Sequence, residues 1–421
     1  MFEQKDKYKK SRFLYIIEAA LQYFISLLVV DAYLAKVTTA IGLSDYVTGI
    51  LTSFVSLGCG FQIVAIFLNK RSVKGWVTIL HSLNQLFFAL IYLVPFFKIG
   101  KIPKAIFFIS FLLLGHIINN IVHSPKINWY MSLVEDHKRG RFTANKEIVS
   151  LIGGMIFSFV MGTVIDHYEA VGNQQAAFIV CGLSIFALMI LHTLTLIFSK
   201  EKPCEDVEKS STKEMLGGLI KDKGLFKVIL VSIFWYVANY TATPFYGTYQ
   251  IKELGFSMTF ISLLAGLHAI CRSVFSFPMG RFADKYSFKS MLNICFIIMI
   301  VAFSLNAFTV PSNGKVMYTI YYLLYAVGMA GISSATINLI YDYVPHEKRI
   351  GALALNGTLS GFAGFFTSLI IGSLVSYIQE NGNMFLGMNV YAQQVVSILA
   401  SILTVVTLVY MNIALRKVEK K

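Results

Sequence analysis

Charged residues are scarce in this sequence. Asp, Glu, Lys and Arg together make up 14% of its 421 residues, whereas hydrophobic residues make up 56% and the mean hydropathy is +0.67. A soluble protein of this length could not bury so much apolar surface. The composition therefore excludes an ordinary soluble enzyme and indicates an integral membrane protein.

The sequence also lacks the short motifs of nucleotide, metal and hydrolytic chemistry. No G-x-x-x-x-G-K-[ST] loop is present, so we do not expect ATP to drive this chain. The five cysteines show neither the spacing of a disulfide framework nor that of a metal site. We interpret them as small apolar fillers: Cys59, Cys181, Cys204, Cys271 and Cys295. We predict that the protein is not an enzyme and has no cofactor and no metal.

Twelve hydrophobic runs of about 20 residues are long enough to cross a bilayer core of roughly 30 Å. Backbone groups in lipid must be paired within their own segment, which predicts helices, and the short alternating strands of a barrel are not visible. The predicted spans are 13–34, 46–68, 75–97, 104–124, 146–166, 174–198, 226–249, 258–280, 288–309, 315–340, 351–377 and 388–415. The sequence therefore predicts an all-α membrane protein.

Lys and Arg are distributed unequally over the segments between these spans. Of 36 such residues, 29 fall on the side that carries both termini, six fall on the other side, and Arg272 lies within a span. The positive-inside rule then predicts a multi-pass protein of the cell membrane with both termini in the cytoplasm. The net charge of +14 reflects basic loops near an anionic leaflet, and we expect no nucleic acid as a partner. The run after Arg12 is too long for a secretory signal, so we expect it to be the first, uncleaved helix.

The two halves of the sequence echo one another. The charged stretch Gly280–Lys289 matches Phe67–Lys74. A stripe of small residues at every fourth position, which favours close helix packing, also occurs twice: Ser150, Gly154, Ser158 and Gly162, then Ser360, Gly364, Ser368 and Gly372. We predict an internal duplication with an N-terminal six-helix bundle over 1–198, a cytoplasmic linker over 199–225 and a C-terminal six-helix bundle over 226–421.

The stretch Gly280-Arg-Phe-Ala-Asp-Lys-Tyr-Ser-Phe-Lys289 resembles the G-x-x-x-D-[RK]-x-x-x-K signature of the major facilitator superfamily. The turns Val134–Arg141 and Val344–Arg349 resemble a second loop motif of that family. The resemblance implies twelve transmembrane helices in two pseudo-symmetric six-helix bundles, with charged turns that gate the inner side. The residues it assigns to gating are Gly280, Arg281, Asp284, Lys285, Lys289, Asn69, Lys70, Lys138, Arg139, Arg141, Lys348 and Arg349.

In that family, a loop aspartate near a helix N-terminus of the opposite half latches the inner side, and Asp284 matches it. Asn69 occupies the corresponding position in the first half, so we expect that latch to be weaker. The alternative is that these charges only orient the loops.

The resemblance also implies that spans 1, 4, 7 and 10 line a central cavity. Each carries polar or aromatic residues at helical spacing, and polar groups in lipid usually face the protein interior. The candidate substrate-binding residues, with two from span 8, are Gln22, Ser26, His116, Asn119, Asn120, His123, Tyr236, Asn239, Tyr240, Thr243, Tyr322, Tyr325, His268 and Arg272. The alternative for each is packing or interfacial anchoring. Pro244 is expected to bend span 7.

Two charged residues lie deep in the predicted spans. Glu18 is the only carboxylate well inside one, since Asp31 lies near an end, and we predict that it couples transport to protons. The alternative is that Glu18 pairs with a cation. Arg272 requires an anionic partner, either Glu18, another carboxylate or the substrate.

Three functions fit this sequence. The first is a secondary transporter of a small polar organic solute, sugar-like or an organic anion, driven by protons across the lipid bilayer and expected to be a monomer. The second is a drug or metabolite exporter, which the absence of a proline in Ser150–Ser158 disfavours. The third is a membrane receptor or scaffold without transport, which gives no reason for four spans with polar faces.

Overall fold

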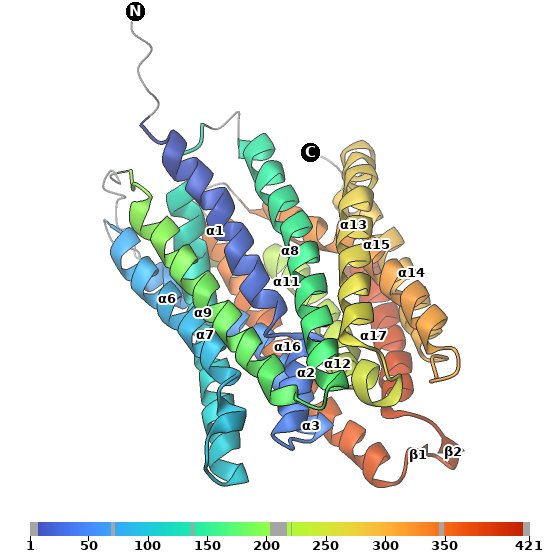
Figure 1. The fold of residues 1–421 in the computed structure, drawn as a ribbon. Coiled ribbons are helices and arrows are strands. Elements are labelled where there is room, and N and C mark those ends of the chain that lie inside the picture. Colours follow the sequence, from blue (N-terminus) through green and yellow to red (C-terminus); the bar gives the residue numbers. More distant parts are fainter. Residues whose placement is uncertain are drawn as a thin grey trace, which may run out of the picture.

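The hydrophobic runs form helices, as predicted. The computed structural model describes residues 7–68, 72–135, 139–202, 217–219, 221–344 and 349–415. In the first half the helices are α1 (Lys9–Leu27), α2 (Asp31–Ala40), α3 (Asp45–Thr52), α4 (Phe54–Gly60), α5 (Val64–Phe67), α6 (Lys74–Ile91), the 3-10 turn η1 (Val94–Phe96), α7 (Lys101–Met131), α8 (Arg139–Ala170) and α9 (Gln174–Phe198) (Figure 1).

The second half is also mainly helical. Its elements are α11 (Lys223–Ala242), the 3-10 turn η3 (Thr243–Phe245), α12 (Tyr246–Thr248), the π-helical turn η4 (Tyr249–Glu253), α13 (Met258–Lys285), α14 (Phe288–Asn306), α15 (Gly314–Tyr343), α16 (Arg349–Glu380), the antiparallel strands β1 (Met384–Phe385) and β2 (Met388–Asn389), and α17 (Ala392–Ala414). The all-α membrane architecture is therefore confirmed.

Nine helices of the described chain are long and apolar enough to cross a membrane, and the bent pair α1–α2 adds a tenth span. The two remaining predicted spans, 46–68 and 75–97, correspond to the broken series α3–α5 and to α6 with η1. The structure is thus consistent with twelve spans. Several helices are longer than predicted, most notably α7, which continues seven residues past the predicted end at 124, to Met131.

The first span is bent by 44° between α1 and α2. At the bend Asp31 has a φ of +47°, a left-handed conformation that is uncommon for a residue other than glycine. The break frees the carbonyl oxygen of Leu28, and the hydroxyl of Tyr92 donates to it at 2.5 Å. The predicted end of this span at 34 is wrong, because α2 continues to Ala40.

The seventh span is interrupted at the predicted proline. Helix α11 ends at Ala242, and Pro244 lies in η3 before the helical path resumes in α12. Proline has no backbone N–H to donate, so the regular α-helical bonding cannot continue through it. The expected disruption by Pro244 is confirmed.

Helices of one half pack mainly on one another, and a few pairs join the halves. In the first half α1 packs on α8 and α9, whereas α8 also packs on α13 and α4 packs on α16 of the second half. The small-residue stripes lie at such contacts: a Cβ at Gly154 would meet the ring of Tyr23, and one at Gly162 would meet the backbone of Met258. The predicted packing role of these stripes is confirmed, and the exact domain limits stay a prediction.

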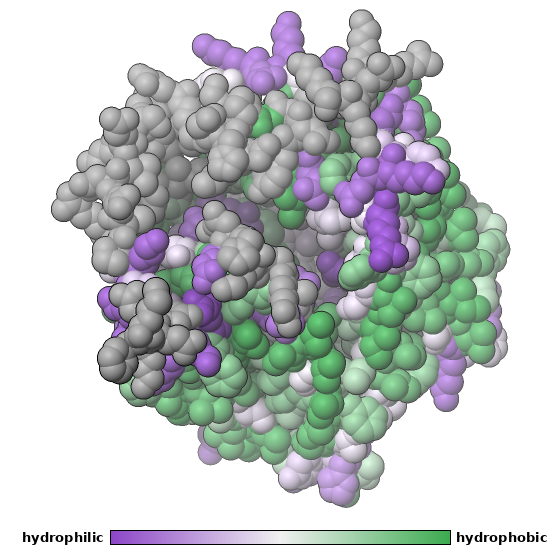
Figure 2. Space-filling view, turned by 90° about the horizontal axis from the view of Figure 1, so that it is seen from above, coloured by the Kyte–Doolittle hydropathy of each residue, from purple (hydrophilic) through white to green (hydrophobic). Residues whose placement is uncertain are grey.

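Helix α1 begins and α17 ends on the same face, which we call the terminal face (Figure 1). Figure 2 views this face from above and shows it hollowed near its centre, with hydrophilic side chains around the hollow. On the opposite face the halves are tied together by polar contacts. The Asp166 carboxylate accepts from the backbone N–H groups of Met258 and Thr259 at 2.8 and 2.7 Å, and Asp45 pairs with Lys252. We call this set of residues the opposite-face latch.

Candidate functional site

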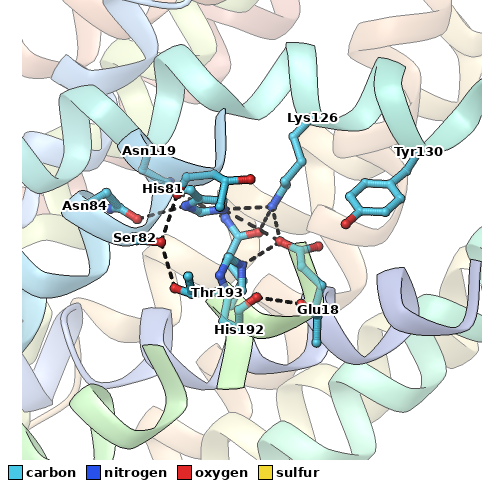
Figure 3. Close-up of polar contacts among 12 residues, drawn as sticks. Glu18, His81, Ser82, Asn84, Asn119, Lys126, Tyr130, His192 and Thr193 are labelled. Carbon is cyan, nitrogen blue, oxygen red and sulfur yellow. Dashed lines mark hydrogen bonds and ion pairs between the residues drawn. The ribbon is translucent and has the colours of Figure 1, made fainter. Parts of the chain in front are cut away.

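A cluster of four buried, ionisable side chains lies in the core of the first half (Figure 3). It brings together Glu18 of α1, His81 of α6, Lys126 of α7 and His192 of α9, each 2% exposed or less. The Oε1 atom of Glu18 accepts from Lys126 Nζ at 2.6 Å and lies 2.7 Å from Nε2 of His192. The Nζ atom of Lys126 is also 2.9 Å from Nε2 of His81. We call these four residues the Glu18 cluster.

An amide connects this cluster to the predicted binding residues. Lys126 donates to Oε1 of Gln22, and Nε2 of Gln22 donates to Oδ1 of Asn119 at 3.0 Å. Within the described residues, Oε2 of Glu18 and Nδ1 of His192 are buried without a hydrogen-bond partner. The cluster therefore has unused capacity to bind a proton or a water molecule.

The cluster also contains a set of atoms that could ligate a metal. One ligand atom each from Glu18, His81 and His192 lie within 4.8 Å of one another. The ammonium group of Lys126 lies 2.6 Å from Glu18 and 2.9 Å from His81, so a positive charge already contacts two of these three residues. Its charge would repel a metal ion, and we interpret the set as an ion-pair network.

Sequence reasoning missed Lys126 because it ended span 4 at residue 124 and counted this lysine among the loop cations. In the structure α7 continues to Met131, and the lysine is buried. Its position three residues after His123 continues the polar face of span 4, a signal that was present in the sequence. The structure also adds a third deep charge to the two predicted from the sequence, and the cation that pairs with Glu18 is Lys126 and not Arg272.

In the second half, predicted binding residues from α11, α13 and α15 do come together. The hydroxyl of Tyr325 donates to Oδ1 of Asn239 at 2.9 Å. The ring of His268 lies 4.7 Å from that of Tyr322 and 6.0 Å from that of Tyr325. Tyr236 and Tyr240 of α11 stack at 5.7 Å. We call these residues the aromatic wall: Tyr236, Asn239, Tyr240, His268, Tyr322 and Tyr325.

The four polar residues of span 4 do not form one surface. The side chain of His116 is buried against the ring of Phe88 on α6, at 5.0 Å. Asn120 accepts from Gln62 at 3.1 Å, and His123 is exposed. Only Asn119, through Gln22, is linked to the Glu18 cluster.

Of three further predicted residues, two form hydrogen bonds to backbone carbonyls close to them in the chain, and the third is exposed. The hydroxyl of Ser26 donates to the carbonyl of Tyr23, and that of Thr243 donates to the carbonyl of Asn239. Such bonds within a helix leave little capacity for a ligand. The exposed Arg272 donates to Oγ of Ser333 at 3.0 Å, and no described carboxylate pairs with it.

Most of the predicted gating turn is helical. Helix α13 continues to Lys285, so Gly280, Arg281, Asp284 and Lys285 lie in its last turns, whereas the sequence suggested a loop. Lys289 is in the first turn of α14 and donates to the carbonyl of Leu415 at 2.9 Å. Asn69, Lys70, Lys138 and Lys348 lie outside the described residues, as do the side chains of Arg139, Arg141 and Arg349. The inner latch stays a prediction.

Comparison with known sequences finds similarity over parts of this chain. The profile described as Major Facilitator Superfamily matches residues 228–421. A transporter of Methanocaldococcus jannaschii described as MFS-type is 29% identical over 202 residues, which are 45% of this chain and 48% of the relative. A second relative, from Bacillus subtilis, is 24% identical over 286 residues, 66% of this chain and 68% of the relative. The matches span 36% and 48% of the length of the first two curated relatives.

Solved structures with the same fold cover nearly the whole chain. A mutant of the nucleoside transporter NupG aligns with a TM-score of 0.75 at 15% identity, covering 96% of this chain and 99% of that one. A D-xylose-proton symporter aligns with a TM-score of 0.72 at 14% identity, covering 94% and 96%. These likenesses establish the overall architecture.

Proposed function

We propose that the chain is a transporter of the major facilitator superfamily that moves a small polar organic solute, sugar-like or anionic, by alternating access coupled to protons. The solved proteins of the same fold include a nucleoside transporter and a D-xylose-proton symporter, whose solutes are polar and ring-bearing. The hollow in the terminal face and the latch on the opposite face support a carrier that opens to one side at a time.

The observation that carries this proposal is the aromatic wall. It offers ring faces from Tyr322 and His268 beside the amide and hydroxyl of Asn239 and Tyr325. A site of this kind binds the faces of a ring-shaped solute and its hydroxyl groups at the same time. A scaffold without transport would have no need of such a surface inside a membrane protein.

Proton coupling is assigned to the Glu18 cluster. When a proton binds Glu18, the carboxylate loses the charge that holds Lys126 and His192. The hydrogen bond from Lys126 to the side-chain amide of Gln22 then becomes more important for holding Lys126, and the same amide donates to Asn119. A proton at Glu18 therefore changes how α1 and α7 are held together, and these two helices belong to the predicted cavity lining. We further propose a monomer in the cell membrane with both termini in the cytoplasm.

Reconstituted protein in liposomes that contain a pH-sensitive dye tests this function. Sugars, nucleosides and organic acids are added outside, and a coupled solute moves protons together with itself. We expect Glu18→Gln to abolish this solute-driven proton flux while counterflow exchange of the same solute persists, because the amide keeps its size and an acceptor but cannot titrate.

The matched control is Glu147→Gln, the same chemical change at an exposed position of α8. It should leave both flux and exchange unchanged. Proton flux that survives Glu18→Gln would remove the coupling role from this cluster, and an absence of exchange for every solute in wild-type protein would contradict transport itself.

A further inference from the structure

The hydrogen bonds around Lys126 fix the protonation state of the Glu18 cluster. An ammonium group has three N–H donors and no acceptor. The Nζ atom of Lys126 faces three acceptors: Oε1 of Glu18 at 2.6 Å, Nε2 of His81 at 2.9 Å, and Oε1 of Gln22. The amide of Gln22 turns its oxygen toward Lys126 because its nitrogen donates to Asn119 at 3.0 Å. Lys126 is therefore charged, and Nε2 of His81 carries no hydrogen.

The second nitrogen of His81 is also engaged. Its Nδ1 atom lies 3.1 Å from Oδ1 of Asn84, and Nδ2 of the same amide donates to the carbonyl oxygen of Gly115 at 2.9 Å. The amide oxygen of Asn84 therefore faces the imidazole, which makes Nδ1 of His81 the donor. A proton added at Nε2 would meet the ammonium group of Lys126, so we expect His81 to stay neutral.

His192 differs from His81 because one of its nitrogens is free. Its Nε2 atom lies 2.7 Å from Oε1 of Glu18, and an ionised carboxylate can only accept, so Nε2 carries the hydrogen. Its Nδ1 atom is buried and has no partner among the described residues. A neutral imidazole fits this position, since an imidazolium would leave a buried N–H group unsatisfied. The lone pair of Nδ1 is thus available to a proton.

The charged and titratable groups that face His192 come from α1, α6 and α7 (Figure 3). Its ring meets that of His81 edge to face at 4.6 Å, its Nε2 contacts Glu18, and Lys126 binds the same oxygen of Glu18. From α8, which also packs on α9, the ammonium group of Lys146 lies 5.6 Å from the centre of the Tyr15 ring on α1. Of these neighbours only Glu18 is negative, so a proton that reaches His192 is attracted toward that carboxylate.

We propose that His192 relays the coupled proton to Glu18 and that His81 takes no part in the transfer. A proton binds the lone pair of Nδ1 and forms an imidazolium. The hydrogen on Nε2 then moves to Oε1 of Glu18, where a lone pair forms the new O–H bond. The imidazole is left neutral with its hydrogen on Nδ1, and the cluster has gained one positive charge. The reverse sequence releases the proton. This inference rests on the proposed coupling role of the cluster and names the residue that carries the proton.

The two histidines are matched controls for each other in the liposome assay. Both are buried, and glutamine replaces either imidazole with an amide that forms hydrogen bonds but does not titrate. We expect His192→Gln to slow solute-driven proton flux at least about tenfold while counterflow exchange persists, since a positioned acid–base group contributes roughly 10²–10⁴-fold to proton transfer. His81→Gln should keep both, because the amide oxygen can accept from Lys126. The relay is wrong if His192→Gln keeps the flux, or if the two variants slow it equally.

Nitrogen NMR of full-length protein with isotope-labelled histidine tests the protonation states separately from transport. At pH 8 we expect hydrogen on Nδ1 of His81 and on Nε2 of His192, and acidification should add a second hydrogen to His192 before His81. The signals are assigned by their loss in the glutamine variants or in His81→Asn and His192→Asn. Titration of His81 first would overturn the proposal. Flux that is lost in Glu18→Gln but complete in His192→Gln would overturn the relay alone and leave the proposed function standing.

Discussion

The Nζ atom of Lys126 lies 2.6 Å from Oε1 of Glu18, and both side chains are almost completely buried. The pair joins α1 to α7 in a low-dielectric interior, where the attraction has to offset the large cost of removing two charges from water. Two imidazoles and an amide also lie within hydrogen-bond distance of the pair, whereas Oε2 of Glu18 has no partner among the described residues. Such a pair is costly to break on one side only.

We therefore expect Lys126→Met to lower the free energy of unfolding by about 3–5 kcal/mol, because Glu18 would then lose the one lysine or arginine that pairs with it among the described residues. Thermal unfolding in detergent measures this effect. The double variant Glu18→Gln/Lys126→Met removes both charges and should recover most of the loss. If the double variant is less stable than Lys126→Met alone, the two residues do not act as a pair.

The aromatic wall gives a second prediction. Tyr325→Phe removes the hydroxyl that donates to Asn239 at 2.9 Å, at a cost of about 1 kcal/mol in stability. We expect a larger effect on the affinity for the transported solute, since the freed amide would no longer be fixed in place. Solute-dependent thermal shifts measure both quantities. Tyr377→Phe, at an exposed tyrosine of α16, is the control and should alter neither.

The fold was predictable because its signals are local. Long apolar runs, the small-residue stripes and Pro244 each act through one helix and its immediate neighbour, and these predictions agree with the structure. The orientation predicted from the excess of basic residues stays a prediction. Helix ends were less predictable: Lys126 suggested the end of a span, yet Glu18, His81 and Gln22 accommodate it inside α7.

The site was predictable only in part, because side-chain partners come from distant segments. The spacing that places Tyr322 and Tyr325 on one helical face is visible in the sequence. The contact of this face with His268 requires α13 and α15 to be adjacent. The lone histidines His81 and His192 carry no sequence signal at all. They join Glu18 only because α6 and α9 pack beside α1 and α7.

The opposite-face latch gives a third prediction. Asp166→Ala leaves the backbone N–H groups of Met258 and Thr259 without their charged acceptor, and each such bond contributes roughly 1.5–3 kcal/mol. The opposite face should then open more often. In a protein without its native cysteines, a cysteine introduced at the buried Ser262 should react with a polar thiol reagent at least about tenfold faster, since tenfold corresponds to about 1.4 kcal/mol.

The control for this prediction is Glu169→Ala. Glu169 bonds Lys36 through both carboxylate oxygens at 2.8 and 2.7 Å, on the same face, but both residues belong to the first half. Breaking that pair should leave the labelling rate of the Ser262→Cys variant unchanged. If both variants accelerate labelling equally, a general loosening of the protein exposes position 262, and not the loss of a contact between the two halves.

Two glycines in transmembrane helices give the last prediction. A Cβ at Gly361 of α16 would lie 2.5 Å from the carbonyl oxygen of Ser56 and 2.8 Å from the amide nitrogen of Gly60, whereas a Cβ at Gly280 of α13 has nothing within 4 Å. Replacing glycine by alanine inside a helix favours the helix by roughly 0.5–1 kcal/mol. Gly280→Ala should therefore preserve or raise the Tm. Gly361→Ala should lower it, because backbone atoms of α4 cannot move aside without separating the helices.

The same pair separates packing from gating. The resemblance to the family assigns Gly280 to the gate, and this structure gives its missing side chain no packing role. If Gly280→Ala keeps its Tm but loses solute exchange in liposomes, the glycine is needed when the terminal face closes and α13 approaches a neighbour. If exchange is unchanged, the gating role of Gly280 is wrong. Gly361→Ala should reduce both Tm and exchange, since α4 and α16 join the two halves.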